Sequence, residues 1–344
     1  MKNNSETIYL SIILVTHNNL SLLKTTLFSL INALRKLKQP IELIIIDNAS
    51  TDETPIFLKQ FKKIYDKDFP IIIIYNKINN HSYAVNLGVK IAKGKYILKI
   101  DDDIDIHEDA IVEALKIIEN SGKIGSVQAL WIKWDDSRIG YIHECDTMLN
   151  FRRIPVLVNK ISEKYVEVPF PIIFFVIFRK DILNSQLMLD PWYHIAYDEV
   201  DFGFRLLELG YRNVIATRSL VRHKGPAKRT PDKYFYYEFR NRLATIVSHF
   251  PLFKALEAIT LYVVSFLFVS TIRVIIFKDA SAARCVIKSL VATKDLIINI
   301  KYLIQKRRCI KNLYCDRSIN IYDILKPPFL SFSSLRPLTK MSNV

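Results

Sequence analysis

Short apolar runs alternate with amphipathic stretches along the first hundred residues of the chain. Four of these runs have the length and the uninterrupted apolar character of buried strands: residues 9–16, 41–50, 69–76 and 95–100. The stretches between them carry apolar residues at helical spacing; we expect Asn18 to cap the first helix and Gly94 to close a helix over residues 82–94. Apolar strands that alternate with helices predict an α/β fold, with a mostly parallel sheet covered by helices on both faces.

Polar side chains follow these predicted strands where each strand ends. They are Thr16, His17, Asn18, Asp47, Asn48 and Asp101–Asp103. In open parallel α/β sheets, ligands bind beyond the carboxyl ends of the strands. The position of these polar groups therefore predicts a ligand site at that edge of the sheet.

Three consecutive aspartates follow the apolar run "KYILKI". Their carboxylates repel one another, so a nearby positive charge is expected to stabilise them. Mg²⁺ and Mn²⁺ prefer oxygen ligands and are often held by one or two carboxylates together with substrate phosphates. Asp101 and Asp103 are two residues apart and could serve such a metal while Asp102 points elsewhere. The alternative is a solvated acidic turn, which would need no second set of polar groups at the neighbouring strand ends.

Four segments together resemble one known family. "SIILVTHNN", "LIIIDNASTDET", "KGKYILKIDDDIDI" and "YDEVDFGFRLLELGYRNV" occur in the order and approximate spacing of family 2 glycosyltransferases, and the resemblance covers about residues 8–245. It implies a GT-A fold, a divalent metal at a D-x-D motif, and transfer of a sugar from a nucleotide diphosphate with inversion. The likeness looks nearest to members that transfer galactofuranose or rhamnose.

The resemblance also implies roles for particular residues on the donor side. Thr16 matches the position that meets the nucleotide, and Asp47 matches the acid that contacts the base, usually uracil or thymine, so UDP or dTDP is the expected carrier. His81 stands where relatives often have a glycine-rich loop, and its side chain could contact the diphosphate. The complete expected donor-binding set is Thr16, Asn18, Asp47, His81, Asp101 and Asp102.

Metal and base positions follow from the same motifs. Asp103 matches the direct metal ligand, Asp101 lies nearer the ribose, and His223 matches a metal-binding histidine, with Mn²⁺ or Mg²⁺ as the expected ion. Asp198 and Glu199 belong to the acidic motif of the catalytic base, with Glu199 at the base position, where many relatives have aspartate. An inverting transfer needs a base for the acceptor hydroxyl and a cation for the leaving diphosphate. The alternative is that these acids merely cap the helix that follows.

Aromatic residues between the D-x-D motif and the acidic motif of the base suggest an acceptor surface. Trp192 and Tyr193 in "DPWYHIAYDE" could stack on a sugar ring, and Trp131 and Trp134 are weaker candidates. Aromatic rings are also ordinary core residues, so a packing role remains open for each.

The excess of positive over negative charge lies entirely in the last third of the chain. Residues 1–217 hold 26 lysines and arginines against 27 acids, whereas residues 218–344 hold 23 against 7. The same region contains an apolar stretch at 255–277, in which residues 258–272 carry no charge. That run is shorter than the roughly 20 residues that span a bilayer, so a peripheral or monotopic helix on an anionic membrane fits better than a transmembrane helix. A helix packed on the catalytic domain or on a second subunit is the alternative, and no nucleic-acid motif appears.

The expected organisation has three parts. Residues 1–225 form a catalytic domain (8–110 for the nucleotide, 111–225 for acceptor and base), residues 226–325 a basic apolar helical region, and residues 326–344 an extended or disordered tail. Four cysteines without a CxxC pair suit a reducing compartment, and the short N-terminal apolar run lacks the features of a signal peptide. These points predict an enzyme at the cytoplasmic face of the cell membrane, which could form a homodimer.

The predicted reaction is transfer of a sugar to a glycan or lipid-linked acceptor. A sugar-phosphate nucleotidyltransferase is the alternative enzyme, but "VTHNNLSLL" lacks the glycine-rich basic loop that those enzymes carry after the first strand. A catalytically degenerate, membrane-bound scaffold is the alternative without activity, and it predicts that the site acids are lost. Asp101, Asp103, Glu199 and His223 are all present.

Overall fold

The structure is a computed structural model, which describes residues 7–183, 188–224, 231–313 and 320–328. The chain divides into two compact units. The first, which we call the sheet unit, comprises Met1–His143 and Arg153–Gly225. The second, the helical unit, comprises Glu144–Arg152 and Pro226–Val344.

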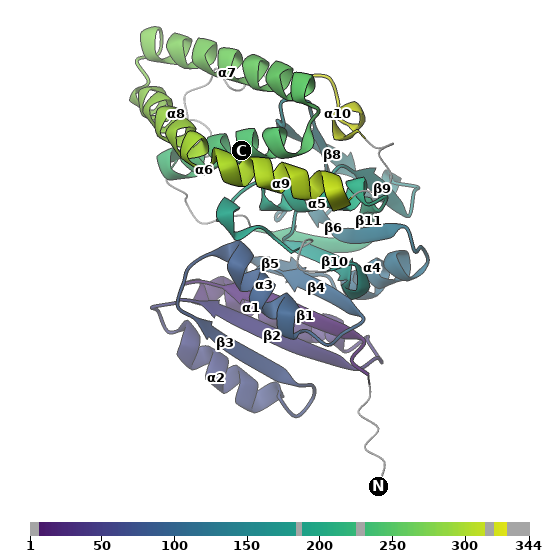
Figure 1. Cartoon of the computed structure of the whole chain (residues 1–344). Coiled ribbons are helices and arrows are strands. Elements are labelled where there is room, and N and C mark those ends of the chain that lie inside the picture. Colours follow the sequence, from purple (N-terminus) through teal and green to yellow (C-terminus); the bar gives the residue numbers. More distant parts are fainter. Residues whose placement is uncertain (1–6, 184–187, 225–230, 314–319, 329–344) are drawn as a thin grey trace. The chain divides into compact units, whose positions relative to one another are not determined.

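A mixed sheet of eleven strands organises the sheet unit (Figure 1). The strands are β1 (Leu10–Thr16), β2 (Ile41–Asn48), β3 (Ile71–Asn76), β4 (Tyr96–Ile100), β5 (Ile104–Ile106), β6 (Ile124–Ile132), β7 (Ile139–Cys145), β8 (Phe151–Leu157), β9 (Tyr165–Val168), β10 (Phe175–Arg179) and β11 (Arg212–His223). The main path runs β3-β2-β1-β4-β10-β6-β11-β5. The four strands predicted from apolar runs are β1 to β4, and they pair in parallel. Strand β10 lies antiparallel between β4 and β6, which makes the sheet mixed.

Helices cover both faces of this sheet, as predicted. Those of the sheet unit are α1 (Leu20–Leu34), α2 (Thr54–Tyr65), α3 (His81–Ile91), α4 (Ala110–Glu119) and α5 (Asp198–Glu208), with short 3₁₀ turns η1 (Val158–Lys160), η2 (Lys180–Ile182) and η3 (Pro191–Tyr193). Successive strand residues point to opposite faces. In β1, Ile12 and Leu14 therefore join the core with α1, α2 and α4, while Ile13 and Val15 join the core with α3 and α5.

Two local expectations were wrong. Helix α1 begins at Leu20 with Asn19 at its N-cap, while Asn18 has a left-handed backbone (φ 49°) and its side-chain oxygen accepts the backbone N–H of Thr51 at 2.7 Å. Asn18 thus ties two loops together and does not cap the helix. Helix α3 ends at Ile91, and Gly94 lies so close to β1 that an added Cβ would stand 2.4 Å from the Ser11 nitrogen. Gly94 is required by this close approach.

The C-terminal region is helical, as predicted. Its elements are α6 (Pro231–His249), α7 (Leu252–Ile275), α8 (Ala280–Ile298), α9 (Ile300–Leu313) and α10 (Ile321–Ile324). Helices α6, α7 and α8 share a core that includes Phe239, Tyr262 and Ala292. Among the described residues, α7 is the one helix long and apolar enough to cross a membrane. Most of the tail predicted from residue 326 lies outside the described residues.

Acid stability of the sheet unit is expected to depend on His143. Burial lowers the pKa of this histidine to about 4, and its Nε2 bonds the Phe170 carbonyl at 2.7 Å. The unfolded chain takes up the proton near pH 6.5, and the folded chain only near pH 4. The free energy of unfolding therefore falls by about 3 kcal/mol in all as the pH is lowered from 6.5 to 4, and the full contribution is present above pH 6.5. His143→Gln should flatten the urea-midpoint profile over pH 4–6.5. An unchanged slope would contradict this assignment.

Candidate active site

The predicted strand-end residues lie at one edge of the sheet. Strand register places Thr16 beside Asp47 and Leu14 beside Ile100, the residue before the aspartate triplet. Asp47 is buried, and one of its carboxylate oxygens accepts the Ser50 N–H at 3.0 Å. Parallel pairing therefore gathers the first, second and fourth strand ends, as the apolar pattern predicted.

His223 reaches the aspartates through a long-range strand pair. Strand β5 starts directly after Asp103 and runs antiparallel to β11 with His223 opposite Ile104. The Lys224 N–H donates to the Asp103 carbonyl at 3.1 Å, which fixes this register. His223 Nε2 lies 3.1 Å from Asp103 Oδ1.

Asp101, Asp103 and His223 form a cluster that fits a divalent metal. One ligand atom from each lies within 4.8 Å of the others. Two carboxylates and an imidazole are suitable donors for Mn²⁺ or Mg²⁺. The His223 ring stacks on Phe174, with 5.1 Å between ring centroids, and its buried Nδ1 has no hydrogen-bond partner among the described residues. The histidine is thus held by packing, with its Nε2 toward the cluster.

A buried lysine beneath the cluster was not predicted. Lys99, in β4, is 1% exposed, and its ammonium contacts the Asp101 carboxylate and donates to the Ile173 carbonyl at 2.7 Å. Lys99 is the one charged residue of the otherwise apolar strand β4. A buried charge needs a partner. The lysine within this apolar strand was therefore the sequence signal that could have predicted an ion pair.

Helix α5 brings its own carboxylates to the same region. Asp198 and Glu199 occupy its first turn, where the helix dipole favours negative charge. Asp198 is buried and accepts the Ser82 hydroxyl at 2.7 Å. Asp201 is fully buried in an ion pair with Arg205 at 2.8 Å, which gives that acid a structural role.

The electrostatics link the two acidic groups. Burial opposes ionisation of Asp101, but Lys99, His81 and His223 outweigh it, and the pKa of Asp101 is lowered. Burial likewise opposes ionisation of Asp198, yet its hydrogen bond with Glu199, together with His81, Ser82 and Lys99, lowers its pKa. Lys99 and His81 thus act on both carboxylates, which indicates that the D-x-D segment and the start of α5 lie near one another.

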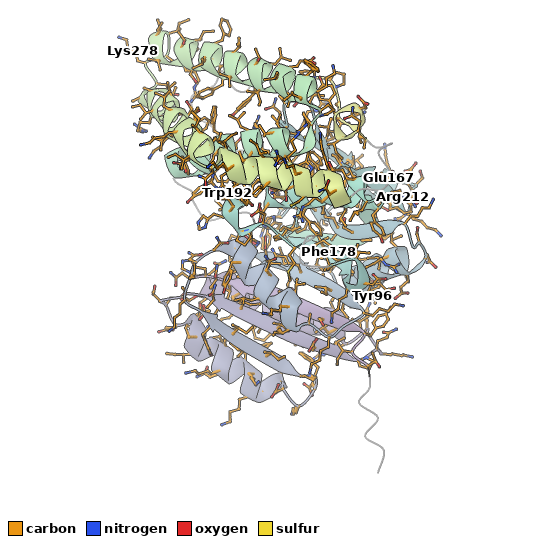
Figure 2. The ribbon with its side chains drawn as sticks, viewed as in Figure 1. Tyr96, Glu167, Phe178, Trp192, Arg212 and Lys278 are labelled. Carbon is orange, nitrogen blue, oxygen red and sulfur yellow. The ribbon has the colours of Figure 1, made fainter. Side chains whose placement is uncertain are left out.

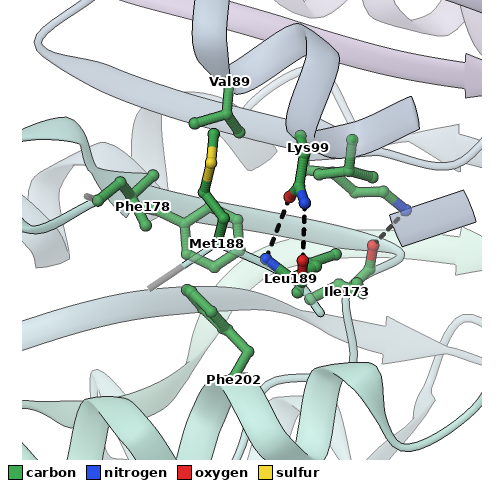
Figure 3. Close-up of a pocket in the computed structure, with 10 residues that line it drawn as sticks. Val89, Lys99, Ile173, Phe178, Met188, Leu189 and Phe202 are labelled. Atoms are coloured by element: carbon green, nitrogen blue, oxygen red, sulfur yellow. Dashed lines mark hydrogen bonds between the residues drawn. The ribbon is translucent and has the colours of Figure 1, made fainter. Parts of the chain in front are cut away.

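The loop that leads into α5 is held by amide side chains of α3. Asn86 donates to the Leu189 carbonyl at 2.7 Å and accepts the Leu189 N–H at 3.1 Å, beside a cavity of about 20 Å³ that Lys99 also lines (Figure 3). Asn80 donates to the Pro191 carbonyl at 3.0 Å. Helix α3 therefore positions both His81 and the segment before Asp198.

Two residues expected to bind the nucleotide, Thr16 and Asp102, are hydrogen-bonded to each other. The Thr16 hydroxyl donates to Asp102 Oδ2 at 2.6 Å, and Asn19 donates to Oδ1 at 3.0 Å. Burial raises the pKa of Asp102 to about 6. With both carboxylate oxygens engaged, Asp102 anchors the triplet to the end of β1 and to the β1–α1 loop.

The predicted acceptor aromatics differ in exposure. Tyr193 is fully buried, so its ring is not exposed to an acceptor in this structure, and its binding role stays a prediction. Trp192 is half-buried and packs edge-on against Tyr193 (Figure 2). Trp131 lies 5.2 Å from the His223 ring and has Arg153 over its own ring, which makes it a support for the histidine.

Loss of the Lys99 charge is expected to destabilise the sheet unit. Lys99→Met removes the cation that contacts Asp101, and breaking this pair should cost about 2–3 kcal/mol because Asp101 is partly exposed. Urea unfolding measures this loss, and Lys95→Met, an exposed lysine four residues earlier, is the matched control. Equal stability of the two variants would show that Lys99 does not compensate this acid.

Comparison of the sequence with known proteins finds relatives that transfer sugars. The profile described as glycosyl transferase family 2 matches residues 11–187. A poly(ribitol-phosphate) beta-glucosyltransferase of Bacillus spizizenii is 33% identical over 105 residues, which cover 30% of this chain and 16% of that protein. The matched segment thus spans about a sixth of the relative's length.

Solved structures show a similar fold. GalNAc-T7, with UDP, GalNAc and Mn²⁺, has a TM-score of 0.56 at 13% identity, covering 87% of this chain and 58% of the other. The mannosyltransferase PcManGT from Pyrobaculum calidifontis, with GDP-Man and Mn²⁺, has a TM-score of 0.54 at 14% identity, covering 83% and 88%. These neighbours support the GT-A-like arrangement.

Proposed function

Because the chain belongs to glycosyl transferase family 2, we propose that it moves a sugar from a nucleoside-diphosphate sugar to an acceptor hydroxyl with inversion at the anomeric carbon. The observation that carries this proposal is the single electrostatic site formed by Asp101, Asp103 and His223 on one side and Asp198 and Glu199 on the other. Metal-ligating groups and a candidate base thus stand together at the edge where α/β sheets bind ligands.

The donor side of the site is assigned to the strand ends. Asp103 and His223 would hold a divalent cation, Mn²⁺ or Mg²⁺, and Asp101, whose carboxylate Lys99 already contacts, would lie toward the ribose. When bound, the cation neutralises charge on the diphosphate. Asp47 would accept a hydrogen bond from the base, and UDP or dTDP is the preferred carrier. Manganese in both structural neighbours supports the ion assignment.

The acceptor side is assigned to the start of α5. Glu199 takes the proton of the attacking hydroxyl, while Asp198, which is bonded to Ser82, keeps Glu199 in place. His81 is near both Asp101 and Asp198 and would contact the leaving diphosphate. Trp192 is the more accessible aromatic candidate for acceptor stacking.

We place the reaction at the cytoplasmic face of a membrane, with a glycan or lipid-linked acceptor. The basic last third of the chain and the apolar helix α7 support this location. Calorimetric titration with UDP, dTDP and GDP, each with and without Mn²⁺, tests the donor assignment. Binding of one nucleotide that requires Mn²⁺ is expected. Binding of none of them, or equal binding without metal, would refute it.

A further inference from the structure

Helix α7 carries apolar residues on two faces, and these faces have different surroundings. One stripe is buried in the helical unit and includes Ala255, Ala258 and Tyr262. The opposite face is exposed, with Val264 61% and Phe268 65% accessible. An apolar face that is exposed along the length of a helix indicates an interaction surface.

The buried stripe of α7 ties this helix to its neighbours. Tyr262 and Phe266 pack with Phe235 and Phe239 of α6, and Ala292 and Leu296 of α8 join the same core. At the far end, Arg273 is buried in an ion pair with Asp279, the residue that caps α8 (Nε to Oδ2, 3.1 Å). A spanning α7 would have to leave this core and carry the ion pair through the hydrocarbon, which is costly.

Helix α8 continues the exposed surface with a different composition. Ile287, Leu290, Val291 and Ile298 are exposed, and they alternate with exposed cations. The exposed cations from the turn onward are Lys278, Arg284, Lys288 and Lys294. Apolar residues interleaved with lysine and arginine are typical of helices that lie at an anionic membrane surface.

Acids do not offset these cations. Between Ala258 and Ile298 the acidic residues are Asp279 and Asp295. Asp279 is paired with Arg273, and Asp295 accepts the hydroxyl of Tyr236. The surface is therefore apolar and cationic, which complements negatively charged lipid headgroups above an acyl layer.

We infer that α7 and α8 form a monotopic anchor that lies in one leaflet of an anionic membrane, with the outer face of α7 in the acyl boundary and the α8 cations among the headgroups. The inference rests on the membrane location proposed above and deepens it. Helix α7, about 36 Å long, then lies along the membrane plane, and the α7–α8 turn stays on the side of the membrane from which the protein binds.

Vesicle binding of the full-length protein tests the surface. The protein should float with phosphatidylglycerol-containing vesicles and much less with phosphatidylcholine alone. Val264→Lys/Phe268→Lys should reduce the bound fraction about tenfold or more, because two buried side chains are lost from the acyl boundary. Gln60→Lys/Thr25→Lys adds the same charge to exposed sites of the sheet unit and should leave binding unchanged.

Labelling distinguishes lying in the leaflet from crossing it. In a Cys309→Ser/Cys315→Ser background, Ala280→Cys places a thiol at the exposed start of α8, and Lys90→Cys is the control in the sheet unit. An impermeant maleimide added outside the vesicles should label both positions. If the thiol at position 280 is labelled only after detergent is added, α7 crosses the bilayer. That result would overturn the inference of a monotopic anchor but would agree with the proposed membrane location.

Two other outcomes would also overturn the inference. If the protein floats with neither kind of vesicle, the proposed membrane location is wrong. The nucleotide titration tests the proposed enzymatic function separately. A dimer in solution that becomes monomeric in Val264→Lys/Phe268→Lys, without vesicle binding by the parent, would make this face a contact between two copies.

Discussion

Glu199→Gln is expected to reduce turnover by roughly 10²- to 10⁴-fold while the affinity for the nucleotide and metal stays unchanged, since this is the range that a positioned general base contributes. Glutamine keeps the shape of the side chain but cannot take the acceptor proton. Asp198 retains its bond to Ser82, so the start of α5 should stay in place. Sugar transfer at saturating donor, measured beside calorimetric nucleotide binding, separates the two effects.

Two further variants sharpen this test. Glu199→Asp, the residue of many relatives, should keep a substantial part of the activity because a carboxylate is retained. Glu119→Gln, at the end of α4 and away from the site, should behave as the parent. Turnover by Glu199→Gln equal to that of Glu119→Gln would remove Glu199 from the role of base.

Asp103→Ala is expected to weaken Mn²⁺-dependent nucleotide binding by about a hundredfold or more and to abolish transfer. Asp103 is the carboxylate closest to His223, at 3.1 Å, and its loss leaves the metal with Asp101, which Lys99 already contacts. Removing one of so few ligands lowers both metal affinity and the charge stabilisation that the metal supplies. The same calorimetric titration measures the change.

Asp105→Asn is the matched control for Asp103→Ala. Asp105 is two residues further on, but its carboxylate is paired with Arg222 at 2.9 Å. The control should bind nucleotide and Mn²⁺ within a few-fold of the parent. Metal-dependent binding retained by Asp103→Ala would mean that the aspartate triplet is a solvated turn.

The apolar pattern was sufficient to predict the parallel half of the fold and the strand ends that carry its polar residues. Family 2 membership, predicted from four motifs, is confirmed by the profile match to residues 11–187. These features are local, because one short segment of sequence is enough to predict a strand and the polar residues that follow it. The same reasoning identified α7 as an apolar helix but could not show which of its faces is buried.

The rest depended on contacts between distant segments. The pairing of β5 with β11, which brings His223 to Asp103, follows from no local pattern, and neither does the bond between Thr16 and Asp102. Tyr193 and Trp192 are adjacent in a similar aromatic sequence, yet only the tertiary fold buries one of them completely. The contacts of Lys99 with Asp101 and the Ile173 carbonyl also depend on the tertiary fold, and the pattern of the apolar strand does not identify them.

The β5–β11 register also has a consequence for the protein while it is being synthesised. The aspartates leave the ribosome well before His223, and translation of the 120 residues between positions 103 and 223 takes roughly 6–24 s at 5–20 residues per second. During that interval the nascent first half of the sheet unit lacks His223, the third side chain of the candidate metal cluster. The nascent chain therefore cannot complete the Asp101–Asp103–His223 cluster until the second half of the sheet has been made.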